Sequence, residues 1–323
     1  MKNTFIVVGG AGFIGSHLVD ALLSDISTFQ VKVIDDFSSG RIEHLQHHGA
    51  NIADGRLIIV QRDLLDESVD WSPIFEGADT VFNLAANPDA RKGITDTMLD
   101  LRLETILTRN VLEAMRISGC KKIIFSSSGT VYGDAGLTAC KEGQGERLPI
   151  SLYGAGKVAS EALISAFCGT FGMSAILLRF GNVVGERATH GCIKDFLEQL
   201  LTDHTNLNVL GDGRQSKPYL YVKEVVAGMM HTLKIIGSWN PGLIEPYNLA
   251  PEGATTVGFI AEELIRQMGL KSKIKYGEGA QGWAGDVPNS RMDMSKLEAT
   301  GFKLERSSDE AVKYAIEQIL KSL

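Results

Sequence analysis

The sequence predicts an α/β protein in which a doubly wound parallel sheet is followed by a smaller, mixed α/β C-terminal lobe. Apolar runs alternate with stretches of helical periodicity in the first part of the chain, and the runs lie at residues 4–8, 31–34, 57–60, 80–85, 122–125 and 175–180. This alternation is typical of a parallel sheet with helices on both faces. Beyond residue 182 the pattern loosens into helical stretches near 192–201, 222–235, 256–268 and 309–321. We therefore expect one domain at 1–182 and a lobe at 183–323, with part of 220–250 returning to the main sheet.

A glycine-rich turn follows the first apolar run and opens a helix. Gly9, Gly12 and Gly15 are spaced G-x-x-G-x-x-G, which differs slightly from the usual dinucleotide fingerprint. Gly9 allows a tight turn, Gly12 lets the backbone approach phosphates, and Gly15 lets helix and strand pack closely. The helix N-terminus then faces the negative charge. These residues predict a Rossmann-like domain that binds a dinucleotide.

An acidic residue ends the second apolar run. Asp35 stands about twenty residues beyond the glycine turn, where a carboxylate can accept a hydrogen bond from the ribose 2′-hydroxyl. The same charge would repel a 2′-phosphate, and Arg41 is the nearest residue that could reverse this preference. The cofactor we expect is therefore NAD rather than NADP. Asp63, after the third run, either faces the adenine or is an ordinary exposed residue at a strand end.

Hydroxyl side chains end the fifth run. Ser126, Ser127 and Ser128 lie where the carboxyl end of a parallel strand would project side chains into the ligand crevice. A hydroxyl at this point can hydrogen-bond a substrate oxygen. The alternative use of such a serine-rich stretch is ordinary turn formation.

Tyr153 and Lys157 are the strongest indication of chemistry. They stand four residues apart on an expected helix and so share one face. A neighbouring cation favours the phenolate of a Tyr, whose free pKa is near 10. Lowering that pKa to ~7 takes about 4 kcal/mol, which a partly desolvated Lys and the positive charge of a nicotinamide can supply. A Tyr and a Lys at this spacing, with no other motif in the chain, are more often ordinary surface residues. Together with the glycine turn in the same sequence, they predict a catalytic base.

In order along the chain, these motifs resemble the extended short-chain dehydrogenases/reductases, specifically the NAD-dependent sugar epimerase/dehydratase group. The resemblance covers nearly the whole chain and rests on the segments GGAGFIGSHLVDALL, VIDDFSSG, VFNLAA, FSSSGTVYGD, SLYGAGK, LRFGNVVG, GDGRQSKPYLYV, YNLA and GDVPNSRMDMSKL. It implies that Ser128 is the hydroxyl residue, Tyr153 the base and Lys157 the cofactor-binding lysine. It also implies that Asn182 contacts the diphosphate of a nucleotide sugar.

The strand-end motif distinguishes the reactions of this group. Dehydratases resemble one another in carrying an Asp-Glu pair here, and decarboxylases usually keep the Glu, whereas this chain has Gly129 and Thr130. The closest likeness is therefore to 4-epimerases of UDP-glucose and UDP-galactose. The resemblance implies that Tyr153 deprotonates the sugar 4-hydroxyl with Ser128 bridging, and that hydride leaves for bound NAD and returns to the other face of a 4-keto sugar. The alternatives are another oxidoreductase, dehydratase or decarboxylase of this fold, and a non-catalytic NAD sensor.

The chain departs from the family pattern around the sugar nucleotide. Lys217 and the stretch around Gln281 stand where relatives commonly place arginines against the diphosphate, and a Lys is a point charge rather than a bidentate fork. The residues that could compensate are Arg187, His190, Arg214 and Arg291, and the alternative for each is an ordinary solvated surface residue. Three further positions differ: Glu104 replaces a common Asn, Asn83 a common His and Val8 a common Thr.

The resemblance and the motifs together give two expected sets of site residues. The expected cofactor site comprises Gly9, Gly12, Phe13, Ile14, Gly15, Asp35, Asp36, Ser38, Ser39, Gly40, Asp63, Leu64, Leu84, Ala85, Ala86, Ser126, Tyr153, Lys157 and Phe180. The expected substrate site comprises Asn87, Ser128, Gly129, Asn182, His190, Val209, Arg214, Lys217 and Asp286.

Composition narrows the class further. The formal net charge of −7 argues against a broad nucleic-acid-binding face. The four cysteines lack metal-type spacing, which favours free thiols in a reducing compartment and no metal site. A strand is expected within a few residues of the N-terminus, and no apolar stretch reaches membrane-spanning length. We therefore expect a cytoplasmic protein without a signal peptide that binds neither nucleic acid nor membrane.

Two long helices are expected at 97–118 and 152–171, with apolar residues on more than one face. Relatives pair these helices in a homodimer, so the resemblance implies one here. The alternative is that both faces pack within the monomer.

Overall fold

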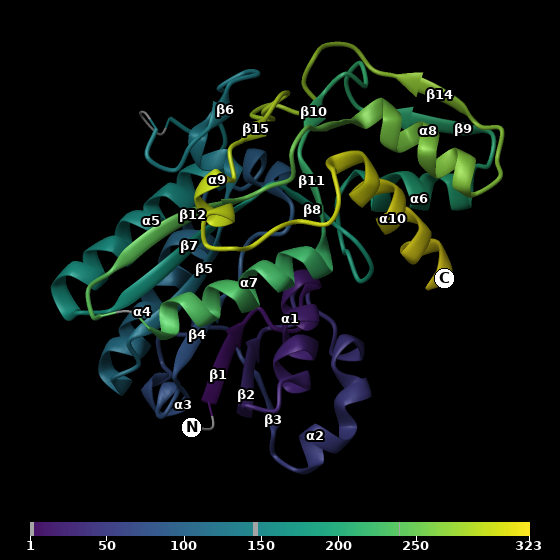
Figure 1. Cartoon of the computed structure of the whole chain (residues 1–323). Helices are drawn as coiled ribbons and strands as arrows, with labels where there is room; N and C mark the ends of the chain where they lie inside the picture. Colours follow the sequence, from purple (N-terminus) through teal and green to yellow (C-terminus); the bar gives the residue numbers. More distant parts are fainter. Residues whose placement is uncertain (1–2, 145–147, 239) are drawn as a thin grey trace.

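The computed structural model describes residues 3–144, 148–238 and 240–323. Within this part of the chain, seven strands form one sheet in the order β12-β7-β5-β4-β1-β2-β3 (Figure 1), and every neighbouring pair is parallel. The strands are β1 (Asn3–Val8), β2 (Thr28–Asp35), β3 (Leu57–Gln61), β4 (Thr80–Asn83), β5 (Lys122–Ser128), β7 (Ser174–Phe180) and β12 (Ile244–Leu249). All six apolar runs become strands of this sheet, so the predicted α/β fold class is confirmed.

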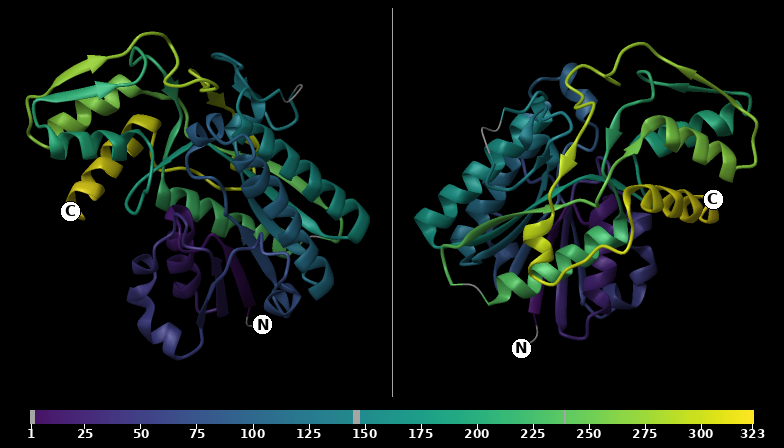
Figure 2. Two further views of the ribbon diagram at one scale, coloured as in Figure 1. Left: turned by 180° about the vertical axis from the view of Figure 1, so that it is seen from behind. Right: turned by 45° about the horizontal axis from the view of Figure 1, so that its top comes forward.

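Helices cover both faces of the sheet. One face carries α1 (Phe13–Ser24) and α7 (Val222–Gly237), which pack against each other. The other face carries α3 (Ser72–Phe75), α4 (Leu107–Ser118) and α5 (Leu152–Phe171), of which α4 and α5 stand in front in the left view of Figure 2. This arrangement is the doubly wound form that strand-helix alternation predicts.

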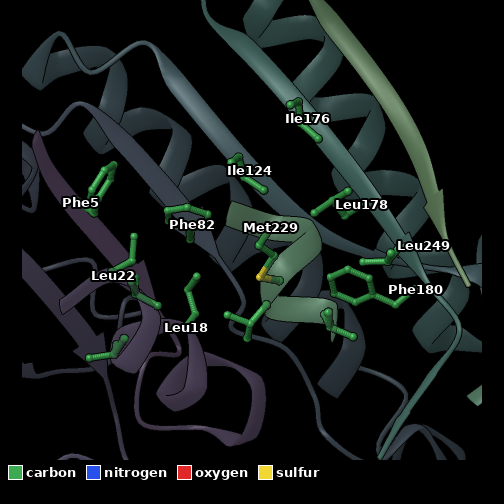
Figure 3. Close-up of a cluster of buried hydrophobic side chains, with 14 of the residues drawn as sticks. Phe5, Leu18, Leu22, Phe82, Ile124, Ile176, Leu178, Phe180, Met229 and Leu249 are labelled. Atoms are coloured by element: carbon green, nitrogen blue, oxygen red, sulfur yellow. The ribbon is translucent and has the colours of Figure 1, made fainter. Parts of the chain in front are cut away.

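Each face of the sheet has its own apolar core, because successive side chains of a strand point in opposite directions. Phe5 of β1 lies in one cluster with Leu18 and Leu22 of α1 and Met229 of α7 (Figure 3). Val7 of β1 belongs to the same cluster. The alternate residues of the same strand face α4 and α5, in a second cluster that contains Ile6, Val8, Phe75, Leu112 and Ile164.

A smaller lobe is built from three helices and short strand pairs. The helices are α6 (Cys192–Thr202), α8 (Val257–Gln267) and α10 (Ser308–Lys321). The strand pairs are β8 (Asn182–Val184) with β11 (Tyr219–Tyr221), β9 (Asn206–Val209) with β14 (Lys273–Tyr276), and β10 (Ser216–Lys217) with β13 (Thr255–Thr256). A further pair joins β6 (Ala139–Cys140), between β5 and α5, to β15 (Arg291–Met292). A third apolar cluster fills the space among α6, α8 and α10.

The chain returns to the sheet layer twice after residue 182. The first return is α7 followed by β12, which adds a strand beside β7. The second return is α9 (Ser295–Glu298), where Met294, Leu297 and Phe302 join the core beneath α1 and α7. The second return was not expected from the sequence, because a segment of this length carries too few apolar positions to show a period.

The helix expected at 97–118 is not uniform. Its first part, η4 (Leu101–Ile106), is a π-helix that runs into α4. The period of 3.6 residues does not predict such a widened turn, and π-turns are frequent at functional sites. The remaining short helices are η1 (Ile42–His44), η2 (Gln46–His48), α2 (Gly49–Ala53), η3 (Ala90–Ile94) and η5 (Gly129–Tyr132).

The strand order places the ligand crevice. Chain order reverses between β1 and β4, and in open parallel sheets ligands bind outside the carboxyl ends of the strands at such a point. The glycine turn follows β1, the segment 84–86 follows β4, and the serines end β5. Segments far apart in sequence therefore meet at one edge of the sheet.

Candidate active site

A cavity of about 1290 Å³ opens at the carboxyl ends of the strands and extends to α6 and α10 of the small lobe. Most expected cofactor residues line it, namely Gly9, Gly12, Phe13, Ile14, Gly15, Asp35, Asp36, Ser38, Ser39, Asp63, Leu64, Leu84, Ala85, Ala86, Ser126, Tyr153, Lys157 and Phe180. The expected substrate residues that line it are Asn87, Ser128, Gly129, Asn182, His190, Lys217 and Asp286. Gly40 lines a smaller neighbouring cavity of about 420 Å³ together with Ser38 and Ser39.

The glycine turn has the shape that a pyrophosphate requires. Gly9 has a φ of +76°, and a Cβ there would lie 2.8 Å from the backbone nitrogen of Ala85. A Cβ on Gly15 would lie 2.1 Å from the carbonyl oxygen of Gly9, so α1 starts directly against the turn. Gly12 is the N-cap of α1, whose first-turn N–H groups have no partner within the helix. The turn and these N–H groups fit the pyrophosphate of NAD.

Asp35 is both a cavity residue and a support for the glycine turn. It is 7% exposed, and its two carboxylate oxygens accept the backbone N–H groups of Ala11 and Phe37, each at 2.9 Å. Burial raises the pKa of this carboxyl. Arg41 is exposed and lines the smaller cavity. Asp63 lies at the cavity wall and accepts the Leu65 N–H at 2.8 Å.

The serine-rich strand end presents one hydroxyl to the cavity with its proton available. Ser128 Oγ accepts both the backbone N–H and the hydroxyl of Thr130, at 3.2 and 3.0 Å. The Ser128 hydroxyl can therefore donate its own proton to a ligand oxygen. Ser126 instead donates to the Asn83 carbonyl at 3.2 Å, and Ser127 donates to the Glu161 carboxylate at 2.7 Å.

Tyr153 and Lys157 share one side of the first turns of α5. Ser151 caps this helix by accepting the Gly154 N–H at 3.1 Å. The Lys157 ammonium lies 5.5 Å from the centre of the Tyr153 ring and donates to the Ser126 carbonyl at 2.8 Å. Both side chains line the cavity. The spacing in sequence thus produces the expected shared face.

The charge around Tyr153 differs from the expectation. Lys157 is paired with the Glu104 carboxylate at 2.8 Å, so its cation is balanced. Burial raises the pKa of Tyr153 well above its ordinary value of 10, and the Glu104 and Asp100 carboxylates raise it further. In the protein alone the pKa of Tyr153 is therefore raised and not lowered, since the expected lowering by Lys157 and a nicotinamide does not take the buried carboxylates into account. The sequence does not show that Glu104 faces the same ammonium.

The polar groups at the far end of the cavity are mostly engaged with one another. Lys217 is ion-paired with Asp286, whose second oxygen accepts the Gly282 N–H at 3.1 Å. Burial lowers the pKa of His190, which therefore adds no full positive charge at neutral pH. Asn87 donates from its side chain to Asp100 at 2.8 Å. Asn182 is exposed at the cavity wall.

Two expected substrate residues lie elsewhere, and these expectations need correction. Val209 is 2% exposed and packs in the core of the small lobe, because β9 turns it towards the lobe helices. Arg214 has an 86% exposed side chain and pairs with Asp212, two residues earlier in the same turn. Two other candidates are also engaged. Arg291 donates to the carbonyl oxygens of residues 216 and 290, and Arg187 pairs with Asp20 at 2.9 Å.

Sequence reasoning missed an ion pair that spans the cavity. Arg91, from the segment after β4, donates to Asp89 at 2.8 Å and to Asp195 of α6 at 3.0 Å. The pair joins the sheet domain to the small lobe. No sequence signal marks it, because the partners on the two sides are 104 residues apart.

A second missed feature is a charge inside the core. Arg179 of β7 is buried and paired with Glu161 of α5. The sequence does indicate this ion pair, because Arg179 stands inside an apolar run, and a buried charged residue must find a partner.

Other features of the described residues lie outside this site. Asp20, His47 and His48 place their potential ligand atoms within 4.8 Å of one another, but both His nitrogens hydrogen-bond the Asp20 carboxylate, which Arg187 also contacts. Among the described helices, none combines the length and apolarity needed to cross a bilayer.

Comparison with known proteins agrees with this site. Residues 5–244 match the model of the NAD dependent epimerase/dehydratase family. The putative UDP-glucose 4-epimerase of Methanocaldococcus jannaschii is 27% identical over 316 residues, which cover 96% of each chain. A solved UDP-galactose 4-epimerase superposes with a TM-score of 0.86 at 34% identity and covers 99% of both chains. The UDP-N-acetylglucosamine 4-epimerase of Methanobrevibacter ruminantium M1, solved in complex with UDP-N-acetylmuramic acid, gives a TM-score of 0.84 at 29% identity, with 100% of both chains covered.

The family match spans most of the chain, and it includes the glycine turn, Tyr153 and Lys157. The chain therefore belongs to the NAD-dependent epimerase/dehydratase family of nucleotide-sugar enzymes, as an epimerase whose cofactor is NAD.

Proposed function

We propose that the protein interconverts UDP-glucose and UDP-galactose by inverting carbon 4 of the sugar, through a transient 4-keto sugar. The observation that carries this proposal is the composition of the strand end. Ser128, Tyr153 and Lys157 line the cavity together, while Gly129 and Thr130 occupy the positions where an acid and a base would be needed to eliminate water. A site with one base and no neighbouring carboxylate at the strand end suits hydride transfer alone.

The residues divide the chemistry between them. NAD, when bound, supplies the acceptor and then the donor of the hydride. Tyr153 holds the proton of the sugar 4-hydroxyl at its phenol oxygen and returns it in the second half of the cycle. Ser128 orients the same sugar oxygen, because its own proton is available while its oxygen already accepts from Thr130. Since one proton is taken and given back, the cycle needs no outside acid, base or oxidant.

We propose that the diphosphate of the substrate lies at the start of α6. Gly191, Cys192 and Ile193 line the cavity there, and the first N–H groups of a helix attract anions. This placement would reduce the need for arginines. Lys217 then contributes as half of the pair with Asp286 rather than as a free cation.

We also propose that two copies of the chain pair through α4 and α5. Large apolar side chains remain exposed on η3, η4, α4 and α5: Ile94, Leu101, Ile106, Ile117, Leu152 and Phe171. Burying such a stripe against a second copy stabilises a dimer by removing apolar area from water.

The four free cysteines favour a reducing compartment such as the cytoplasm. The domain division we propose is 1–182 and 183–323, with α7, β12 and α9 returning to the sheet layer.

The test is to incubate the purified protein, without added cofactor, with UDP-, GDP-, CDP- and dTDP-sugars, including 2-acetamido forms. Products are followed by chromatography with mass detection, and Tyr153→Phe serves as the matched control. A new peak of unchanged mass, absent with the variant, supports the epimerase and identifies its sugar. A product lighter by water or carbon dioxide would instead assign a dehydratase or decarboxylase. No reaction with any sugar, in protein that carries NAD, would favour a sensor.

A further inference from the structure

The Lys157 ammonium has a buried counter-ion behind the active site. Its Nζ lies 2.8 Å from a carboxylate oxygen of Glu104, and the two side chains are 1% and 0% exposed. Placing two charges out of water costs several kcal/mol per ion unless they pair closely and gain further hydrogen bonds. Lys157 gains one, by donating to the Ser126 carbonyl at 2.8 Å. This pair is therefore a specific arrangement and not a chance contact of surface charges.

Glu104 is held in place from three directions. It lies in the π-helix η4, whose widened turn aims the side chain at α5. One carboxylate oxygen accepts the backbone N–H of Asn87 at 3.0 Å. The Glu104 carbonyl accepts the Ser160 hydroxyl at 2.8 Å, and a Cβ on Gly156 would lie 2.7 Å from the Glu104 Cβ. The glycine lets α5 approach η4 closely enough to bring Lys157 onto the carboxylate.

A second carboxyl lies beside this pair. Asp100 is buried, its Oδ1 accepts from the Asn87 side chain at 2.8 Å, and its Oδ2 has no hydrogen-bond partner among the described residues. Burial raises the pKa of both carboxyls, Asp100 and Glu104. The contacts of the two groups differ, since the Glu104 oxygens face an N–H and an ammonium, two donors that act against burial and favour the charged form. This geometry assigns the proton to Asp100 and the negative charge to Glu104.

We propose that Glu104 is a positioning residue that clamps Lys157 and balances its charge, so that the ionisation of Tyr153 is set by Glu104 as well as by Lys157. The proposal deepens the proposed function, on which it rests. The groups that face Tyr153 and Lys157 are Glu104 of η4 and Asp100 at the N-cap of η4, with the uncharged Asn87 after β4 and the Ser126 carbonyl of β5.

The charge balance gives the site a specific behaviour. With Glu104 ionised, the ammonium gives the phenolate little net help. The positive charge of the oxidised nicotinamide then becomes the main force that favours proton removal from the sugar. The base is therefore active when the cofactor is ready to accept a hydride, and Tyr153 keeps its proton when it is not.

The test is a titration of the phenolate that needs no substrate. The near-ultraviolet absorbance of the NAD-loaded protein is followed against pH, and the same titration of Tyr153→Phe is subtracted to isolate Tyr153. Glu104→Gln removes the charge at nearly constant shape. We expect its Tyr153 midpoint to fall by roughly one to three pH units, since a nearby charge shifts a pKa by that amount. Should this variant not fold, Glu104→Asn removes the same charge in a shorter side chain.

Two controls separate charge from shape. Glu104→Asp keeps the carboxylate and is expected to keep the wild-type midpoint. Asp100→Asn replaces a group that we assign as neutral, and its midpoint is also expected to stay. An unchanged Tyr153 midpoint in Glu104→Gln, or in Glu104→Asn where that variant replaces it, would overturn the proposal. A fall of the same size in Asp100→Asn would overturn the assignment of the negative charge to Glu104. Because turnover is not measured, a protein that epimerises none of the sugars still gives a clear result.

Discussion

Arg179 and Glu161 form an ion pair that solvent does not reach. The Nε and Nη2 of the guanidinium donate to the two carboxylate oxygens at 2.8 and 2.7 Å, and the side chains are 0% and 2% exposed. Ser127 donates its hydroxyl to the same carboxylate at 2.7 Å. The pair therefore ties β7 to α5 directly beside the strand that ends in Ser128.

We predict that Arg179→Leu destabilises the fold by about 3–5 kcal/mol, because it leaves the Glu161 carboxylate buried without its cation. The double variant Arg179→Leu/Glu161→Leu should lose less than the single one, since apolar residues can replace a buried pair at small cost. Denaturant unfolding of the two single variants and the double variant measures this coupling. Losses that simply add would contradict the account.

We predict that Tyr153→Phe folds and binds NAD but loses turnover by about 10²- to 10⁴-fold, the usual contribution of a general base. In the wild type, activity should rise with pH, because the raised pKa of Tyr153 makes the phenolate scarce at neutral pH. Steady-state rates over a pH series, with NAD content measured by denaturing release, provide the test. A variant with comparable activity would remove Tyr153 from the mechanism.

We predict that Asp35→Ala weakens NAD binding by roughly 10- to 100-fold, as expected for the loss of a hydrogen bond to a charged group. NADP binding should change much less, because the lost carboxylate also repels a 2′-phosphate. NADP thus serves as the internal control for the glycine turn, which Asp35 supports through the Ala11 N–H. Equal losses for both cofactors, measured by calorimetry, would mean that Asp35 acts only on the turn.

We predict that Gly15→Ala abolishes NAD binding and destabilises the protein by at least about 1–3 kcal/mol, since the new methyl group would lie 2.1 Å from the Gly9 carbonyl oxygen. Gly169→Ala is the matched control. It lies within α5, and beyond the adjoining backbone of that helix a Cβ there meets no atom of the described residues within 4 Å. This control should gain about 0.5–1 kcal/mol from the helix propensity of Ala. Thermal melts measure the stability of both variants, and titrations measure their NAD affinity. Stability and NAD affinity in Gly15→Ala equal to those of Gly169→Ala would contradict the prediction.

We predict that the protein loses stability as the pH falls below about 6.5, the pKa of His in an unfolded chain. Burial lowers the pKa of His17 in the fold, where its ring nitrogen contacts the Glu186 carbonyl at 3.1 Å. Between the two pKa values the unfolded chain binds a proton that the native state refuses, so acid favours unfolding. His17→Gln should reduce this slope in urea unfolding at a series of pH values. An identical slope in the variant would exclude His17 as the cause.

The sequence predicted the sheet well because six of its seven strands carry their own apolar run, and the glycine turn because its conformation leaves little choice of residue. It also predicted the shared face of Tyr153 and Lys157, which requires only a helical turn. It did not predict that Val209 packs into the lobe core, since a Val at a strand end has the same local sequence pattern whether it lines a cavity or packs in a core. Arg214 was misplaced for a related reason, because a charged residue near a ligand and one near solvent have the same local pattern.

The sequence by itself determined most strands of the sheet, the glycine turn and the spacing of the reactive pair, because these depend on neighbours within a few residues. Only the tertiary structure decided the charges. Glu104 reaches Lys157 through a π-helical turn packed against a glycine, and Arg91 reaches Asp195 across the cavity. Electrostatic energy depends on distance and burial in space, and residues far apart in the chain carry no local sign of either.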